Sequence, residues 1–313
     1  MRNPLRFFPS ASAITALLVL GLHAFGQSPA VPQVKISDIP PQTQQGQGPG
    51  KYVPPVPAKA DLPALWLIGD STVRNGSKGD NGPEGQWGWG APIVAYFDLA
   101  KINVVNRALG GTSSRSFYNK NWKDLKPLIK KGDIVIMNFG HNDPGNKADP
   151  ADARASIKGI GDETREVATT QGAKETVHSF GWYLKQFVEE TRSAGATPII
   201  CSLTPRKSWG DDGKLNHGGG YADWAEQTAK DTKTLFVPLN DIIAAKYSEF
   251  GKDKVEHFYV PSPKESLHTG WDGAAVNAEC VISGLKALSD DPLKGYFSPR
   301  AEAVAAWTGK PAK

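Results

Sequence analysis

The feature that most constrains the fold is a series of short apolar segments separated by longer amphipathic stretches. Five of these segments are predicted to be strands: Leu65–Ile68, Ile102–Val105, Ile134–Phe139, Pro198–Leu203 and Leu235–Leu239. Apolar residues recur at helical spacing between and after them, at Val177, Phe180, Leu184, Phe187, Val188 and Thr191, and again at Ala278, Val281, Ile282, Leu285 and Leu288. Strands that alternate with helices predict a parallel sheet covered on both faces. Because the sequence has no internal repeat and no second apolar core, we expect one domain over residues 63–313.

Two N-terminal segments fall outside this pattern. Residues 1–26 contain Arg2 and Arg6, a short apolar stretch from Ala11 to Leu22, and small residues at Ala24 and Gly26, which together predict a secretory signal peptide. The apolar stretch is too short to span a bilayer, so we expect a secreted or periplasmic protein with no membrane anchor after cleavage. Residues 27–62 are rich in Pro, Gln and Gly and predict a linker or an arm draped over the domain.

Charge and cysteine content narrow the class of protein further. Removing the signal peptide takes away two arginines and no acidic residue, so the formal net charge falls from +4 to +2. A nearly balanced charge gives no support for nucleic-acid binding. Cys201 and Cys280 lie in apolar stretches, and we expect two buried thiols, with a disulfide as the alternative in an exported chain. The cysteines and the six histidines show no metal-ligand spacing, so we expect no metal site.

Polar clusters follow the predicted strands at the end where each strand leaves the sheet. They are Gly69–Thr72, Asn106–Ser113, Gly140–Asp143 and Thr204–Arg206, with Glu265–Thr269 well after the fifth strand. The carboxyl ends of parallel strands meet at one edge of the sheet, which is where open α/β folds place their ligands. We therefore expect these clusters to form one site.

The residue types in these clusters suit ester hydrolysis through a serine. Ser71 supplies a hydroxyl, His268 an imidazole that can take its proton, and Glu265 a carboxylate that can orient the imidazole. The backbone N–H groups of Ser71 and Gly111 and the side-chain amide of Asn142 are candidate oxyanion donors. Two alternatives stay open: Asp70 or Ser71 caps a turn and has no chemical role, or Asp253 or Glu256 replaces Glu265 as the carboxylate.

These clusters resemble the four sequence blocks of the SGNH (GDSL-type) hydrolases. GDST, NRALGGTSSRS, GHND and the late HT before a helix occur in the family's order, and the stretches VVNRALGGTSSRSF and VIMNFGHND are similar to rhamnogalacturonan acetylesterases, carbohydrate esterase family 12. The resemblance extends from about residue 64 to residue 288. It implies a three-layer α/β/α sandwich with a flavodoxin-like five-stranded parallel sheet, and no metal or organic cofactor. It also implies that Ser71 is the nucleophile, His268 the base, and Gly111 and Asn142 oxyanion donors. The family usually has Asp three residues before the histidine, where this chain has Glu265.

Further side chains near the same edge are candidates for substrate binding. Trp89, in the Trp87–Gly90 segment, is a candidate for stacking on a sugar ring, with a packed turn as the alternative. Arg74, Arg115, Arg206 and Lys207 could pair with the carboxylates of a galacturonate-containing chain, or could belong to a solvated face. We interpret His141 as a structural residue and the HGGG segment at His217–Gly220 as a surface loop near the site, because the corresponding lipase loop precedes its nucleophile.

The sequence therefore predicts an exported serine esterase, a carboxylic ester hydrolase that removes acetyl groups from pectic polysaccharide, with rhamnogalacturonan as the expected substrate. The alternatives are an acetyl xylan esterase, another carbohydrate or lipid ester hydrolase of the same fold, and a polysaccharide-binding protein without activity. The sequence is silent on the oligomeric state.

Overall fold

The centre of the molecule is a five-stranded parallel sheet. The computed structural model describes residues 1, 30, 32–39, 54–75, 85–145, 153–168 and 172–309. The strands are β1 (Ala64–Gly69), β2 (Asn103–Asn106), β3 (Ile134–Asn138), β6 (Thr197–Cys201) and β7 (Leu235–Val237). Their order across the sheet is β2-β1-β3-β6-β7, with every neighbouring pair parallel. This is the flavodoxin-like order, and it confirms the five predicted strands and the predicted fold class.

The strands bury side chains on both faces of the sheet. Along β1, Leu65 and Leu67 belong to one hydrophobic core, and Trp66 and Ile68 belong to the other. All six residues of β1 are buried, which explains why the segment reads as a continuous apolar run with no polar alternation. The indole N–H of buried Trp66 donates to Asp133 at 2.8 Å, so its polar atom is satisfied.

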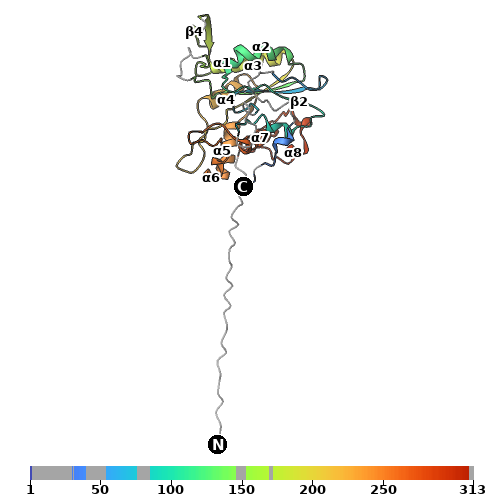
Figure 1. The fold of residues 1–313 in the computed structure, drawn as a ribbon, viewed down its shortest axis with the longest axis vertical. Coiled ribbons are helices and arrows are strands. Elements are labelled where there is room, and N and C mark those ends of the chain that lie inside the picture. Colours follow the sequence, from blue (N-terminus) through green and yellow to red (C-terminus); the bar gives the residue numbers. More distant parts are fainter. Residues whose placement is uncertain are drawn as a thin grey trace.

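Helices cover the two faces in separate layers (Figure 1). One layer contains α1 (Ser114–Phe117), α2 (Lys123–Leu125), α3 (Phe180–Ser193) and α4 (Tyr221–Asp231). The opposite layer contains α5 (Leu239–Phe250), α6 (Lys252–Glu256), α7 (Trp271–Lys286) and α8 (Pro299–Glu302). The described residues also form shorter elements: 3₁₀ helices η1 (Ile36–Asp38), η3 (Pro92–Tyr96), η5 (Lys126–Leu128) and η6 (Lys294–Tyr296), and the π-helical turn η4 (Tyr118–Trp122).

One predicted helix begins later than its apolar spacing indicated. Val177 is buried as expected, but it lies in the strand β5 (Lys174–His178), which pairs antiparallel with β4 (Thr164–Ala168). The helix α3 starts at Phe180 because the Ser179 hydroxyl caps it, accepting from the Trp182 N–H at 3.1 Å. The β4–β5 hairpin extends from the edge of the molecule in Figure 1 and was not predicted.

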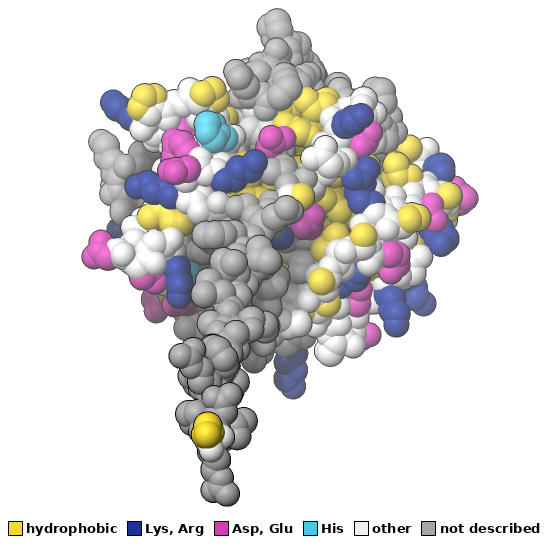
Figure 2. Space-filling view, turned by 90° about the horizontal axis from the view of Figure 1, so that it is seen from below, with side chains coloured by type: hydrophobic (Ala, Val, Ile, Leu, Met, Phe, Trp, Pro, Cys, Tyr) yellow, Lys and Arg dark blue, Asp and Glu magenta, His cyan; other side chains and the backbone are white. Residues whose placement is uncertain are grey.

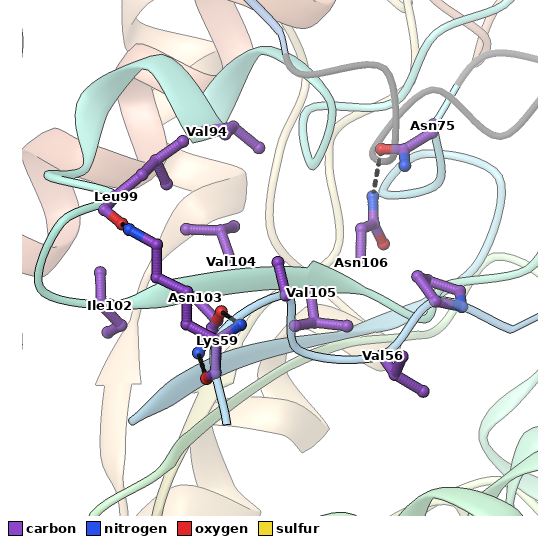
Figure 3. Close-up of a pocket in the computed structure, with 12 residues that line it drawn as sticks. Val56, Lys59, Asn75, Val94, Leu99, Ile102, Asn103, Val104, Val105 and Asn106 are labelled. Atoms are coloured by element: carbon purple, nitrogen blue, oxygen red, sulfur yellow. Dashed lines mark hydrogen bonds between the residues drawn. The ribbon is translucent and has the colours of Figure 1, made fainter. Parts of the chain in front are cut away.

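The described parts of the N-terminal arm lie against the domain. Lys59 and Asn103 exchange two hydrogen bonds, and the Lys59 ammonium donates to the Leu99 carbonyl at 2.9 Å (Figure 3). Farther along the arm, the Trp271 indole donates to the Val34 carbonyl at 2.5 Å. The segment at Lys59 therefore packs beside β2, an edge strand whose exposed edge would otherwise be open to pairing. The predicted signal peptide beyond Met1 lies outside the described residues.

Cys201 in β6 and Cys280 in α7 are buried free thiols, which confirms the prediction made for them. Burial raises the pKa of both thiols. On the face shown in Figure 2, Lys and Arg side chains are interspersed with Asp and Glu. In the part of the chain that the structure describes, no helix has both the length and the apolar composition needed to cross a membrane.

Candidate active site

Ser71 lies in the turn that directly follows β1. The preceding Asp70 is fully buried and holds the turn: its Oδ1 accepts from the Thr72 N–H at 2.8 Å and from the Thr72 hydroxyl at 2.9 Å. Burial raises the Asp70 pKa to about 6, an effect that the Thr72 hydrogen bonds and the nearby His268 partly oppose. The carboxylate therefore has the turn-capping role that was one alternative for this segment, and it presents Ser71 at the end of the strand.

Ser71 and His268 come together although 197 residues separate them in the chain. The Ser71 Oγ is 2.9 Å from the His268 Nε2. His268 lies in the loop before α7, and its carbonyl accepts from the Val260 N–H at 3.0 Å, which fixes the loop backbone. This distance is within hydrogen-bond reach, as proton transfer from hydroxyl to imidazole requires.

Glu265 bonds to the other nitrogen of the same imidazole. Its Oε2 lies 3.0 Å from the His268 Nδ1. Its Oε1 accepts from three consecutive backbone N–H groups, those of Ser266, Leu267 and His268, at 2.9, 2.7 and 2.8 Å. The side chain thus folds back over its own loop, and this is how the extra methylene of glutamate is accommodated. Glu256, an alternative carboxylate, instead pairs with the Lys207 ammonium at 2.7 Å.

These hydrogen bonds keep the Glu265 carboxylate charged. Burial alone would raise its pKa, but the N–H groups of His268 and Leu267 and the imidazole outweigh that effect and leave the pKa below its usual range. A charged carboxylate at Nδ1 favours the imidazole tautomer whose Nε2 is free to accept the Ser71 proton.

The candidate oxyanion donors lie on loops that are bonded to one another. The Gly69 carbonyl accepts from the Leu109 N–H at 3.0 Å and from the Thr112 hydroxyl at 3.2 Å, which joins the Gly111 turn to the Ser71 turn. The Asn142 amide donates to the Thr112 carbonyl at 3.0 Å, which joins the third loop to the second. Gly111 has a φ of 79° and no atom within 4 Å of the position of a Cβ, so its backbone conformation calls for glycine while the space beside it is open.

Arg154 is a contact of the site that sequence reasoning missed. Its Nη1 donates to the Asn142 Oδ1 at 3.3 Å, which fixes the amide so that its nitrogen faces the opposite way, toward the Gly111 turn. Arg154 lies in a loop with no apolar pattern and no motif, so only the fold reveals its place beside Asn142.

Asp143, next to Asn142, is a buried carboxyl group that accepts hydrogen bonds from neighbouring segments. It is fully buried and accepts from the Ser114 N–H at 3.2 Å, from the Ser114 hydroxyl, and from the Ser156 hydroxyl at 3.1 Å. Burial raises its pKa to about 7, and the hydrogen bonds from Ser114 and Ser156 only partly offset this. The carboxyl group thus joins the loop after β3 to the start of α1 and to the loop that contains Ser156.

Two predicted substrate-binding residues are not available to a substrate. Trp89 has no exposed surface, and its indole N–H donates to the Asn138 Oδ1 at 3.2 Å, so it packs in the core and cannot stack on a sugar. Arg115 is 1% exposed and forms a two-pronged ion pair with Glu175 at 2.8 and 2.9 Å. Both predictions were wrong because residue type alone does not determine burial.

Arg74 and Arg206 remain candidates for substrate binding. Arg74 is partly buried against Gly110, where a Cβ would come within 2.7 Å of its Nη1, and Arg206 is exposed after β6. His141 bonds to the Thr204 hydroxyl through its Nε2 at 3.2 Å. Burial and the charge of Arg206 lower the His141 pKa to about 3, so the ring is neutral, which agrees with its interpretation as a structural residue. Within the described ranges, no three His, Cys, Asp or Glu side chains group so as to hold a metal ion.

A hydroxyl, an imidazole and a carboxylate in one hydrogen-bonded line, at the carboxyl edge of a flavodoxin-like sheet, form the arrangement that serine hydrolases use. The sequence model of the GDSL-like Lipase/Acylhydrolase family matches residues 67–275, more than half of the chain. The chain therefore belongs to this family, which confirms the resemblance to the SGNH hydrolases.

Curated relatives agree with this assignment, and a solved structure has a similar fold. The chain is 28% identical to the rhamnogalacturonan acetylesterase of Emericella nidulans over 71% of its own length and 84% of the relative's. It is also 28% identical to a probable rhamnogalacturonan acetylesterase of Bacillus subtilis, over 72% of its own length and 93% of the relative's. The X-ray crystal structure of the protein YXIM of Bacillus subtilis is similar in fold, with a TM-score of 0.58 and 22% identity. The similar region covers 72% of this chain and only 56% of the YXIM chain.

Proposed function

We propose that this protein is an exported carbohydrate esterase that removes acetyl groups from pectic polysaccharide, with rhamnogalacturonan as the main substrate. The observation that carries the proposal is the line from the Ser71 Oγ through the His268 ring to the Glu265 carboxylate, with distances of 2.9 and 3.0 Å. The two relatives described above bear the name rhamnogalacturonan acetylesterase, which supports this choice of substrate. The signal-peptide pattern of residues 1–26 supports export.

The reaction begins at the acetyl carbonyl. The Ser71 oxygen attacks the carbonyl carbon while its proton passes to the His268 Nε2. The charged Glu265 stabilises the imidazolium through Nδ1. His268 then gives the proton to the sugar oxygen as the C–O bond breaks, which leaves an acetyl group on Ser71. Water, deprotonated by His268, then attacks the acetyl carbonyl. The bond between the acetyl carbon and the Ser71 oxygen breaks, His268 returns its proton to that oxygen, and acetate leaves.

The tetrahedral intermediates carry a negative oxygen that needs donors. The N–H groups of Ser71 and Gly111 and one N–H of the Asn142 amide have this role in the proposed mechanism. The other Asn142 N–H is held by the Thr112 carbonyl, and the Asn142 Oδ1 is held by Arg154, so the amide is fixed before the charge develops. Donors that need no reorganisation contribute most to stabilising a transition state.

Acetate release tests the proposal. The purified protein is incubated with acetylated rhamnogalacturonan fragments, with acetylated xylan, and with p-nitrophenyl acetate. We expect acetate from the first and third substrates, faster release from rhamnogalacturonan than from xylan, and loss of all activity in Ser71→Ala. Full activity in Ser71→Ala would contradict the mechanism, and equal or faster release from xylan would contradict the substrate.

A further inference from the structure

A hollow of about 330 Å³ lies beside the candidate active site. The loop after β3, the segment after β6, the loop that leads into α4 and Asn240 at the start of α5 line it. The side chains from the first three segments include His141, Thr204, Arg206 and His217. Its volume falls within the range of about 300–1,000 Å³ that small-ligand pockets occupy. The mechanism above uses none of these side chains.

The hollow adjoins the loop that carries Glu265 and His268. The Arg206 Nη1 lies 3.5 Å from the Ser266 hydroxyl, and the next residue, Lys207, donates its N–H to the Ser266 carbonyl at 2.7 Å. Ser266 in turn donates its N–H to Glu265. A sugar in the hollow would therefore lie next to the sugar whose ester reaches Ser71.

Arg206 gives this hollow its charge. In the described ranges, no carboxylate forms an ion pair with the Arg206 guanidinium, whereas Arg115 is paired with Glu175 and Lys207 with Glu256. Because His141 is neutral, Arg206 is the fixed positive charge on this part of the wall. An exposed guanidinium without a carboxylate partner suits a ligand that brings its own carboxylate, which it can bind through two parallel hydrogen bonds.

The other side of the hollow is already internally bonded. The His217 Nδ1 lies 2.7 Å from Asp241, and the N–H groups of Gly218 and Gly219 donate to Asn240 and Asp223 at 2.6 and 2.9 Å. The Asp241 and Asp223 carboxylates are therefore already bonded to the loop that precedes α4, and these contacts hold that loop in place. Recognition of an anion in this hollow therefore depends on Arg206 rather than on the amides of Gly218 and Gly219.

We propose that this hollow is a subsite for a uronate residue of the substrate, with Arg206 binding the sugar carboxylate. The inference rests on the proposed function for its polysaccharide, but it makes a separate claim about binding. It gives the protein a preference for acidic over neutral chains that the reacting groups alone do not supply.

Isothermal titration with unreacted sugars tests the subsite without requiring catalysis. The full chain is titrated with trigalacturonate and with a neutral galactose trisaccharide, and the titrations are repeated with Arg206→Gln and Arg165→Gln. Arg165 is an exposed arginine of the β4–β5 hairpin, so its variant removes the same charge elsewhere. We expect trigalacturonate to bind at least tenfold more tightly than the neutral sugar in low salt. Arg206→Gln should weaken it about tenfold, and Arg165→Gln should bind like the unmodified protein.

Equal binding of the two sugars, or trigalacturonate affinity that survives Arg206→Gln, would overturn the subsite even if acetate release is confirmed. Conversely, a protein that binds trigalacturonate through Arg206 but releases no acetate would retain the subsite and lose the proposed function. Kinetics then link the two claims: in an active protein, the ratio of kcat/KM on acetylated uronate fragments to kcat/KM on p-nitrophenyl acetate should fall about tenfold in Arg206→Gln. An unaltered ratio would contradict placing the hollow next to the reacting sugar.

Discussion

Two carboxyl groups at the same edge of the sheet, Glu265 and Asp143, respond to their surroundings in opposite ways. Glu265 is partly exposed and accepts from three backbone N–H groups and an imidazole, and its pKa is lowered. Asp143 is fully buried and accepts mainly from the backbone N–H and hydroxyl of Ser114 and the hydroxyl of Ser156, and its pKa is raised to about 7.

The difference shows how one edge can hold a reactive carboxylate and a structural one. Enough N–H donors keep Glu265 ionised, so that its charge is available to His268 throughout the reaction. Deep burial makes the charged form of Asp143 unfavourable. The carboxyl group therefore acts by accepting hydrogen bonds that join neighbouring segments, and not through its charge. Exchanging each carboxylate for its amide should therefore affect activity in one case and stability in the other.

The largest expected effect is that of Glu265→Gln on turnover. The amide retains the shape but removes the charge at Nδ1, so kcat on p-nitrophenyl acetate should fall about 10²- to 10⁴-fold with little change in KM. The free energy of unfolding at pH 7, from urea titration, should change by less than about 1 kcal/mol, because the side chain is partly exposed. Turnover within a few-fold of the unmodified protein would show that the charge of Glu265 does not assist His268.

The raised pKa of Asp143 predicts a pH dependence of stability. Between its usual value of 3.8 and about 7, the folded protein binds a proton at Asp143 that the unfolded chain has released. Asp143 therefore lowers the free energy of unfolding as the pH rises through this window, by at most about 4 kcal/mol.

Urea titrations from pH 4 to pH 8 measure this dependence, with Asp143→Asn as the control. The decrease in the free energy of unfolding that Asp143 causes as the pH rises should be missing in the variant. A variant with the same pH slope as the unmodified protein would show that Asp143 does not titrate with a raised pKa.

A smaller effect is expected for Asp143→Asn at constant pH. The Ser114 N–H donates to both Asp143 oxygens at 3.2 Å, and the amide replaces one of these acceptors with an NH₂ group that faces the N–H, so the free energy of unfolding at pH 7 should fall by about 1–3 kcal/mol. Activity at a temperature where the variant is folded should fall less than in Glu265→Gln. If Asp143→Asn reduced kcat as much as Glu265→Gln, the contrast between the two groups would be wrong.

The smallest effect should come from Glu265→Asp. The charge is retained, but the shorter side chain cannot satisfy both the loop N–H groups and the imidazole as Glu265 does, so kcat should fall about three- to tenfold. Comparing kcat of this variant with kcat of Glu265→Gln separates the effect of the side chain's charge from the effect of its length. A loss as large as that of Glu265→Gln would indicate that position, and not charge, governs this residue.

The sequence made the sheet and the reacting residues predictable for a physical reason. β1, β2 and β3 are buried along their whole length and β6 along all but its first residue, so these strands read as apolar runs, and the polar clusters follow them at the same edge. The β4–β5 hairpin carried no such signal, because most of its residues are exposed and only Val167 and Val177 are buried.

The errors in the candidate site have a related cause. Whether Arg115 is free for a ligand depends on Glu175, 60 residues away, and whether Arg154 reaches Asn142 depends on how its loop packs. Such long-range pairings leave no periodicity in the chain. The same holds for Trp89, which packs in a hydrophobic core and donates its indole N–H to Asn138, 49 residues away.

The most direct test of the central claim is to locate the nucleophile by labelling. The full chain is treated with a fluorophosphonate, which reacts with activated serines, and the modified residue is identified by peptide mass spectrometry, with His268→Ala as the matched variant. The account predicts one adduct, on Ser71, and labelling at least a hundredfold slower in His268→Ala. An adduct on another serine, or unchanged labelling of Ser71 without His268, would contradict it.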